Sequence, residues 1–393
     1  MSLFSGIDLD AVGPALAAND VDGWLLFDFH GINPIAKRVI GYAGMATRRL
    51  FVWLPKVGTP VALAHRIELQ GIEGFPGEVR PYAAWQELHQ LLGEVVNGKK
   101  LAMETSPDDA VPSLDRVPAG VVSLVERLGG TVVSSAAMVS LFAARWSTAE
   151  LEGHRAAAET LADIARRTIQ DVVGRVGEAR EAGVQREVLQ AMENAGLTTD
   201  HPPIVAFGSN AANPHYEPCD GSDSELKAGE VVLIDLWGGK TLHTVFADQT
   251  WMGFAGTTPP DDVVRAWTTA RDARDAVLQH LERAFAEGRP VTGADLDDVA
   301  RGHITKHGYG DAFVHRTGHS IDIELHGSGP NLDNFETNDV RQLLPGTGFS
   351  IEPGIYLPGR FGIRTEINVY LHETGPEPTP VERQQDLITQ RSS

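Results

Sequence analysis

The chain has 393 residues, 42% of them hydrophobic and 22% charged, which is typical of a soluble globular protein with room for two domains. Its 53 acidic and 33 basic residues give a formal net charge of -20, and such a surface repels nucleic acids and anionic membranes, so we expect neither as a partner. The single cysteine, Cys219, excludes an intramolecular disulfide and a cysteine-rich zinc site.

No targeting or membrane segment is expected from the sequence. The N-terminal residues lack a basic stretch followed by an apolar core, so we predict no signal peptide. The longest apolar runs have the length of a strand and are too short to span a bilayer. With a single cysteine, the chain suits a reducing compartment, and a cytoplasmic location is predicted.

Residues 1–145 alternate between strand-like and helix-like segments. Apolar runs of strand length alternate with segments of helical periodicity, which favours an α/β layer. The predicted strands are 23–29, 49–54 and 59–64, and the predicted helices are 85–96 and 120–128.

A second domain, 146–393, is predicted to begin at a capping box. Ser147 is followed three residues later by Glu150, the pattern that opens a helix. The segments that follow are predicted as helices 147–176, 184–195, 261–288 and 292–307, and as strands 231–236 and 243–254. Most of the remainder reads as strand and loop, and the polar residues 384–393 are predicted to fray.

Four carboxylates and a histidine stand out in the second domain. Asp235 is predicted to end a strand at the rim of a sheet, with Asp248 on the next strand returning to that rim, and Glu352 and Glu366 fit a second hairpin of the same kind. His319 lies between the two hairpins. Roles in turns and caps stay open for each carboxylate. If the groups converge, they suit a pair of hard or borderline divalent cations and a hydrolase that activates water.

The motifs around these residues resemble a known family. They read, in chain order, Asp-x-Thr at 248–250, His-x-x-Gly-His at 315–319, Glu-Pro-Gly-x-Tyr at 352–356 and Gly-x-Arg-x-Glu at 362–366. Their order and local sequence resemble the pita-bread metallopeptidases, which include methionine aminopeptidase, aminopeptidase P, prolidase and the metal-free relative creatinase. The resemblance covers nearly the whole chain.

The resemblance implies a fold and a branch of the family. Residues 1–145 are similar to the α/β N-terminal domain of the creatinase and prolidase type, and residues 146–393 to the α+β pita-bread catalytic domain. Because methionine aminopeptidase lacks the first domain, the similarity points to the prolidase and aminopeptidase P branch. A homodimer is expected.

The resemblance also assigns roles to residues. It implies a metal-ligand set and the catalytic and substrate-binding residues around it, with Glu352 also carrying the proton to the leaving nitrogen. The metal ligands are Asp235, Asp248, His319, Glu352 and Glu366; the catalytic residues are His215, His326 and Glu352; the substrate-binding residues are His215, His326 and Arg364. Since all five ligands are kept, creatinase-like chemistry without metal is disfavoured. Two manganese or cobalt ions are expected, with zinc as an alternative.

The implied activity is hydrolysis of the peptide bond that precedes proline, in Xaa-Pro dipeptides. One alternative is an aminopeptidase P acting on longer Xaa-Pro peptides, and another is a scaffold that keeps the fold without activity. Substrate specificity stays open because the chain departs from the family pattern at Trp251, Arg316, Ser320 and Asp322. Arg316 would line or obstruct the pocket, or pair with a nearby acid as a solvated charge.

Overall fold

The chain forms two compact units, Met1–Arg145 and Trp146–Ser393, in a computed structural model that describes residues 3–42 and 46–391. The second unit opens with the predicted capping box. The backbone N–H of Ser147 donates to the Glu150 carboxylate over 2.7 Å, and the N–H of Glu150 donates to the Ser147 hydroxyl over 3.3 Å. Both bonds satisfy groups that a helix N-terminus otherwise leaves unpaired.

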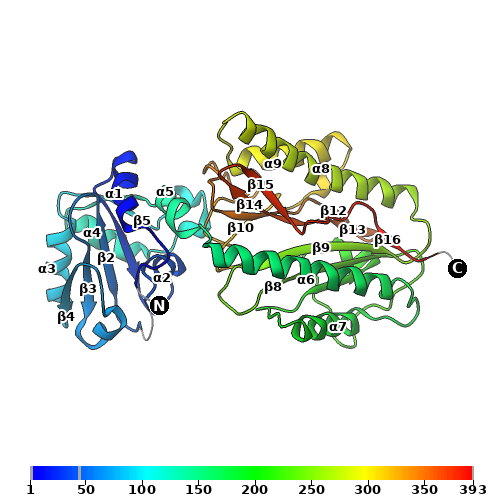
Figure 1. Ribbon diagram of the computed structural model, residues 1–393, viewed down its shortest axis with the longest axis horizontal. Coiled ribbons are helices and arrows are strands. Elements are labelled where there is room, and N and C mark those ends of the chain that lie inside the picture. The colour runs from blue at the N-terminus through cyan, green and yellow to red at the C-terminus, as the bar shows by residue number, and fades with distance from the viewer. Residues whose placement is uncertain (1–2, 43–45, 392–393) are drawn as a thin grey trace. The chain divides into compact units, whose positions relative to one another are not determined.

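The first unit is built on one mixed sheet with the strand order β4-β3-β2-β1-β5-β6 (Figure 1). The strands are β1 (Gly23–Asp28), β2 (Leu50–Pro55), β3 (Val61–His65), β4 (Glu78–Tyr82), β5 (Lys100–Met103) and β6 (Thr131–Ser134). The helices are α1 (Leu9–Ala18), α2 (Pro34–Ile40), α3 (Trp85–Val96), α4 (Ala119–Arg127) and the short α5 (Ala136–Met138).

Alternating side chains of this sheet fill two separate cores. On β1, Trp24 and Leu26 pack with α1 and α2, whereas Leu25 and Phe27 pack with α3 and α4. Successive side chains of a strand point to opposite faces, so a strand that is apolar throughout is covered on both sides. The first unit is therefore a three-layer α/β/α structure.

The second unit places two pairs of helices around three sheets. The helices are α6 (Thr148–Val172), α7 (Glu181–Asn194), α8 (Asp261–Ala286) and α9 (Gly293–Lys306). The strands are β7 (Ile204–Phe207), β8 (Val231–Gly238), β9 (Ala247–Phe254), β10 (Ser320–Ile321), β11 (Gly348–Ile351), β12 (Gly354–Leu357), β13 (Phe361–Arg364), β14 (Ile367–His372), β15 (Gly375–Thr379) and β16 (Ile388–Thr389). The sheets have the orders β16-β9-β8-β7, β10-β11-β14-β15 and β12-β13.

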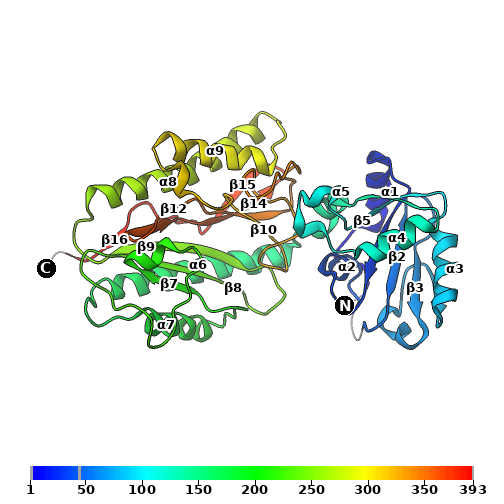
Figure 2. The same cartoon turned by 180° about the vertical axis from the view of Figure 1, so that it is seen from behind.

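The sheets of the second unit lie between the two helix pairs. One core joins α6 and α7 to β7, β8 and β9, and another joins α8 and α9 to β11–β14 and to the opposite face of β8 and β9. Figures 1 and 2 show the sheets between α8 and α9 on one side and α6 and α7 on the other. The inward faces of β8 and β9 therefore meet the sheet formed later in the chain.

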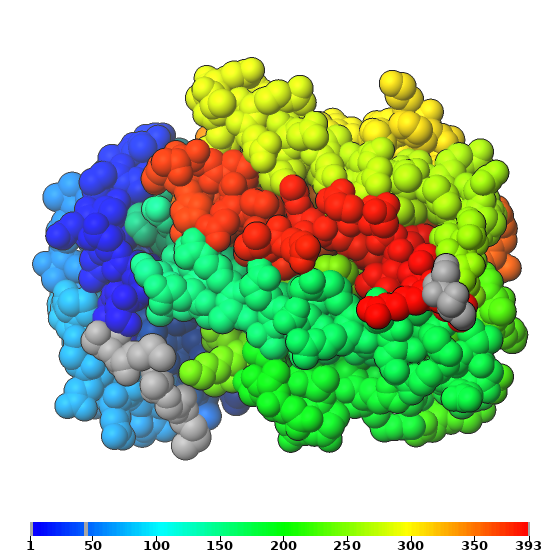
Figure 3. Space-filling model, turned by 45° about the vertical axis from the view of Figure 1, so that its right-hand side comes forward, coloured from blue at the N-terminus to red at the C-terminus, as the bar shows by residue number. Residues whose placement is uncertain are grey.

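The last described residues are more ordered than the sequence suggests, so the prediction that 384–393 frays is wrong for 384–391. Strand β16 pairs in parallel with β9, and the Gln384 side chain bonds both the N–H and the C=O of Met252. Figure 3 shows the red C-terminal segment between the green and yellow helices of the second unit. The polar composition of this segment gave no sign of strand β16, because β9, the strand with which it pairs, lies far away in the sequence. Residues 392–393 lie outside the described part.

Within the described residues, no helix has the length and apolar character needed to cross a bilayer.

Candidate metal centre

Asp235 and Asp248 lie on adjacent antiparallel strands and face the same side of the sheet. Asp235 pairs with Thr250 in the ladder of β8 and β9, and Asp248 pairs with Trp237. Because β8 continues to Gly238, the prediction that Asp235 ends its strand at the rim is wrong. The sequence could not show where β8 ends, because Trp237 and Gly238 continue the alternation of the strand. Asp235 instead projects from the middle of the strand into the interior.

His319 is held beside these aspartates by close backbone packing. Its N–H donates to the Ser350 hydroxyl over 2.9 Å, and its Nδ1 lies 3.1 Å from the carbonyl oxygen of Ser320. Since a carbonyl only accepts, Nδ1 carries a hydrogen, and Nε2 is left to face the carboxylates of Asp248 and Glu352, where its lone pair would be available to a metal ion. Gly318 permits the approach, because a Cβ there would lie 2.0 Å from the Ser350 carbonyl oxygen.

Glu352 and Glu366 flank the hairpin of β12 and β13. Glu352 follows the end of β11, and Glu366 lies between β13 and β14. The hairpin pairs Gly354 with Arg364, so its base brings the two glutamates back to one place. The predicted second hairpin is therefore present, with both carboxylates just outside its strands.

The five predicted ligands converge in the structure. Candidate ligand atoms of Asp248, His319 and Glu366 all lie within 4.8 Å of one another. His319 Nε2 lies 3.4 Å from Asp248 Oδ2 and 3.4 Å from Glu352 Oε1. Asp235 is linked to Glu366 through the Thr250 hydroxyl, which lies 3.1 Å from Asp235 Oδ1 and 2.9 Å from Glu366 Oε2.

These carboxylates lack the positive charge that their burial requires. Burial raises the pKa of Asp235 to about 7, with Asp248 and Glu352 raising it further against the opposing charge of Arg364. Burial and the neighbouring carboxylates, Asp248 first, also raise the pKa of Glu366 well above its usual value. Among the described residues, Glu366 Oε1 is buried without a hydrogen-bond partner. Divalent cations would supply both the charge and the missing partner, so the donor set fits them.

Arg364 is the principal cation within this group. It is 4% exposed, forms an ion pair with Asp235, and donates through Nε to the Thr250 hydroxyl over 2.9 Å. The Tyr356 hydroxyl lies 3.4 Å from Arg364 Nη1 and 2.8 Å from His315 Nε2. Arg364 therefore orients Asp235, and His315, which has no role by sequence, orients Tyr356.

A cavity of about 380 Å³ opens onto these residues. Its walls come from residues 213–215, from residues 314–326 together with Glu336, and from the ends of β11 and β13. They are Asn213, Pro214, His215, Val314, His315, Arg316, His319, His326, Glu336, Glu352 and Arg364. The predicted substrate-side residues His215, His326 and Arg364 are thus all at the cavity.

The His326 ring meets the His319 ring edge-on, with centroids 4.3 Å apart. The charge of His319 and burial lower the pKa of His326 to about 3. A neutral imidazole at this place can donate one hydrogen bond and accept another. This is the state expected of a hydrogen-bond donor beside a metal site.

Several predicted specificity residues lie away from the cavity. Trp251 is 4% exposed and packs in the core under α6. The Asp322 carboxylate accepts from the N–H groups of Glu324 and Ser328, so it shapes its own loop. Tyr216, next to His215, donates to Glu181. Of the departures from the family pattern, only Arg316 lines the cavity.

Thr250 and Glu336 belong to the site although sequence analysis gave them no role. Thr250 bonds Asp235, Glu366 and Arg364, and its signal was the Asp-x-Thr pattern with alternation on a strand. Glu336 comes from a loop with no local motif, so only the tertiary structure reveals it.

A buried glutamate holds the segment that carries His215. Glu181 accepts hydrogen bonds from the backbone N–H of Phe207 (2.6 Å), the backbone N–H of Ser224 (2.7 Å) and the Tyr216 hydroxyl (2.7 Å). It is 0% exposed. One carboxylate therefore ties both ends of the 207–224 segment to the start of α7.

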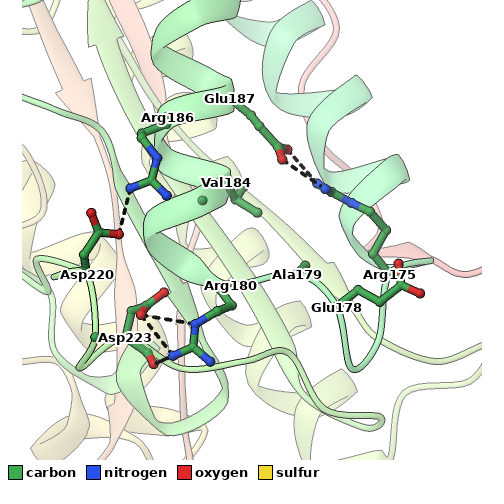
Figure 4. Close-up of a pocket in the computed structure, with 11 residues that line it drawn as sticks. Arg175, Glu178, Ala179, Arg180, Val184, Arg186, Glu187, Asp220 and Asp223 are labelled. Carbon is green, nitrogen blue, oxygen red and sulfur yellow. Dashed lines mark hydrogen bonds and ion pairs between the residues drawn. The ribbon is translucent and has the colours of Figure 1, made fainter.

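A second pocket, of about 310 Å³, lies near the start of α7, and Glu181 is not among its lining residues (Figure 4). Its arginines all have acidic partners: Arg175 with Glu187 at 2.6 Å, Arg180 with Asp223 at 3.0 Å, and Arg186 with Asp220 at 2.8 Å. Figure 4 shows two of these pairs, one from Arg186 on α7 and one from Arg180 just before α7, reaching the loop with Asp220 and Asp223. The pocket is therefore a set of satisfied ion pairs that fasten the loop.

Comparison with known proteins shows the family of this chain. Residues 152–373 match the model of metallopeptidase family M24. The chain is 30% identical over 333 residues to the "Probable dipeptidase PepE" of Mycobacterium tuberculosis, covering 82% of this chain and 80% of that protein. It is 37% identical over 194 residues to the "Xaa-Pro dipeptidase" of Lactobacillus delbrueckii subsp. lactis, covering 49% of this chain and 48% of that protein.

The fold is shared with a solved relative. The crystal structure of dipeptidase PepE from Mycobacterium ulcerans matches with a TM-score of 0.78 and 25% identity, covering 97% of this chain and 96% of that chain. The predicted pita-bread fold and the predicted metallopeptidase class are confirmed. The chain belongs to metallopeptidase family M24.

Proposed function

We propose that this metallopeptidase hydrolyses the peptide bond before proline in Xaa-Pro dipeptides, using two divalent metal ions. The observation that carries the proposal is the meeting of four carboxylates and one imidazole beside a cavity of about 380 Å³. The names of the relatives, "Xaa-Pro dipeptidase" and "Probable dipeptidase PepE", support this substrate class.

Asp235, Asp248, His319, Glu352 and Glu366 would hold the metal ions. Mostly oxygen ligands with one nitrogen suit manganese or cobalt, with zinc as the alternative. Bound divalent cations lower the pKa of water and polarise a scissile carbonyl. The protein's own contribution is the orientation of these ligands, through Thr250 and Arg364 for Asp235 and through Ser320 for His319.

Glu352 is our candidate for moving the proton during hydrolysis. Its side chain is 15% exposed and lines the cavity, while the Ser350 hydroxyl donates to Oε1 over 3.0 Å and fixes the carboxylate. It would accept one proton from water as the C–O bond forms, and give that proton to the proline nitrogen as the C–N bond breaks.

His215 and His326 are our candidates for holding the substrate carbonyl. Both line the cavity, on segments that lie far apart in the sequence. A neutral imidazole N–H can stabilise negative charge on the carbonyl oxygen as the tetrahedral species forms. Arg364 would act mainly through Asp235, to which it is already bonded.

Replacement of single ligands tests the proposal. Asp235→Ala, His319→Ala and Glu366→Ala are each expected to lower the bound metal measured by mass spectrometry and to abolish Ala-Pro hydrolysis. Asp311→Ala, at an exposed position outside the cavity, is the matched control and is expected to keep both. Wild-type metal content and turnover in the three ligand variants would contradict the ligand set.

The choice between dipeptides and longer peptides is tested by comparing Ala-Pro with Ala-Pro-Ala as substrates. We expect the dipeptide to be cleaved with the higher kcat/KM. We also propose a homodimer in the cytoplasm, which light scattering and cell fractionation would check.

A further inference from the structure

The backbone at Arg316 is fixed from several sides. Arg301 of α9 donates to the carbonyl of His315 over 2.8 Å, and the Arg316 N–H donates to Glu336 over 2.8 Å. The Arg316 carbonyl accepts from His315 Nδ1 over 2.7 Å. The point from which the Arg316 side chain enters the cavity is therefore set by hydrogen bonds on both sides of its Cα.

The guanidinium of Arg316 itself has no such bonds. Within residues 3–42 and 46–391, Arg316 forms two hydrogen bonds, one through its backbone N–H and one through its carbonyl oxygen, and none through its side chain. By contrast, Arg364 and Arg301, the arginines beside it, are each paired with an aspartate. A half-buried guanidinium on the wall of a cavity retains donors that can bind an anion.

Apart from the metal ions of the proposed function, the charges around this cavity disfavour an anion. The chain carries a net charge of -20, and the cavity opens onto Glu352 and Glu336. Because the charge of Arg364 is already engaged by Asp235, Arg316 is the arginine of the cavity wall whose guanidinium forms no ion pair or hydrogen bond within residues 3–42 and 46–391; its charge acts on Glu352 at longer range. An anionic ligand group would therefore be drawn to it.

We propose that Arg316 binds the C-terminal carboxylate of a dipeptide substrate and so selects dipeptides over longer peptides; this assignment rests on the proposed function. In an Xaa-Pro dipeptide the carboxylate stands on the ring next to the scissile nitrogen. In a longer peptide that position is a neutral amide, which cannot form a charged two-point contact with a guanidinium.

Binding of two uncleavable ligands to the metal-loaded protein tests the proposal. Each is Ala-Pro with the scissile carbonyl replaced by CH2; one ends in a carboxylate and the other in a carboxamide. Calorimetry is expected to give about ten- to hundred-fold tighter binding of the acid by the wild type, as for a charged hydrogen-bonded pair. Arg316→Gln should bind both ligands with the affinity that the wild type has for the amide.

Two further variants test whether the preference for the acid depends on the shape of the guanidinium and on this particular arginine. Arg316→Lys keeps the charge without the planar fork and should retain an intermediate preference. Arg360→Gln removes an arginine that pairs with Asp262 outside the cavity and should retain the wild-type preference. For hydrolysis, Arg316→Gln should raise KM for Ala-Pro by a similar factor and leave KM for Ala-prolinamide unchanged.

If Arg316→Gln kept the wild-type ratio of affinities for the acid and the amide, the assignment would be overturned. An equal loss of affinity for both ligands would overturn it as well. If the wild type cleaves Ala-Pro but binds acid and amide alike, only the assignment of Arg316 fails. If the wild type binds neither ligand and cleaves no Xaa-Pro peptide, the proposed function fails with it.

Discussion

Removal of the Glu181 carboxylate should loosen the cavity wall that carries His215. Glu181 is the first residue of α7 and accepts hydrogen bonds from the two ends of the 207–224 segment. The change Glu181→Ala removes every one of these acceptors while leaving the helix in place, because alanine favours a helix.

The expected loss of stability follows from the donors left behind. The buried N–H of Phe207 and the N–H of Ser224 would lose their acceptor, at about 1–3 kcal/mol each. Tyr216 and Asn210, whose amide also donates to Glu181 over 3.0 Å, are half-buried, so the hydroxyl and the amide can turn to water. The total is about 2–6 kcal/mol of unfolding free energy, out of the ~5–15 kcal/mol typical of a domain.

Urea unfolding, followed by tryptophan fluorescence, measures this loss, and hydrolysis of Ala-Pro well below the midpoint measures its effect on the site. We expect a higher KM as well as a lower kcat, since His215 is carried by the released segment. Tyr216→Phe, which removes one of the bonds, should cost about 1 kcal/mol. Glu178→Ala, at an exposed neighbouring position, should stay within about 0.5 kcal/mol of the wild type.

A Glu181→Ala protein with the stability of the Glu178→Ala control would refute the reasoning that this carboxylate holds the segment. A destabilised variant with unchanged KM and kcat would refute the link from Glu181 to the position of His215.

Two other changes have outcomes fixed by the structure. Gly318→Ala would place a Cβ 2.0 Å from the Ser350 carbonyl oxygen, so we expect a loss of several kcal/mol and reduced metal binding; Gly302→Ala, in open space on α9, should instead gain up to about 1 kcal/mol. Thermal unfolding of the pair checks this, and equal midpoints would contradict it. Burial lowers the pKa of His154 to about 4 from an unfolded value of about 6.5, so the unfolded chain binds more protons between these values and stability falls by up to about 3 kcal/mol as pH drops from 6.5 to 4. In His154→Gln the urea midpoint should depend less on pH across that window, and an equal slope in both proteins would contradict the assignment.

The proposed ligand positions were open to prediction because they lie on patterned strands or in short motifs next to them. Asp235 and Asp248 occur in segments whose apolar alternation identifies strands, and Glu352 and Glu366 occur in short motifs with recognisable turns. The α3 helix, Trp85–Val96, was predicted with the same bounds. Local sequence carries such features because hydrophobic periodicity and turn chemistry act over a few residues.

What escaped prediction depends on contacts between distant segments. Glu336 reaches the cavity from a loop without a motif, and Glu181 forms its bonds with the 207–224 segment from the start of a helix. The end of β8 was placed too early at Asp235 because an acidic residue usually marks the end of a buried strand. Here Thr250 and Arg364 bond the carboxylate within the strand, although burial still raises its pKa.

The Gln384 side chain and strand β16 have a consequence for solubility. An uncovered β9 would present free N–H and C=O groups along the edge of a sheet, which invites pairing with another molecule. The Gln384 amide accepts from Met252 N–H over 2.9 Å and donates to its carbonyl over 2.6 Å, as a neighbouring strand would, and Ile388 and Thr389 continue the cover. Residues 384–389 thus cover the edge of β9, the strand that carries Asp248, and prevent its pairing with another molecule.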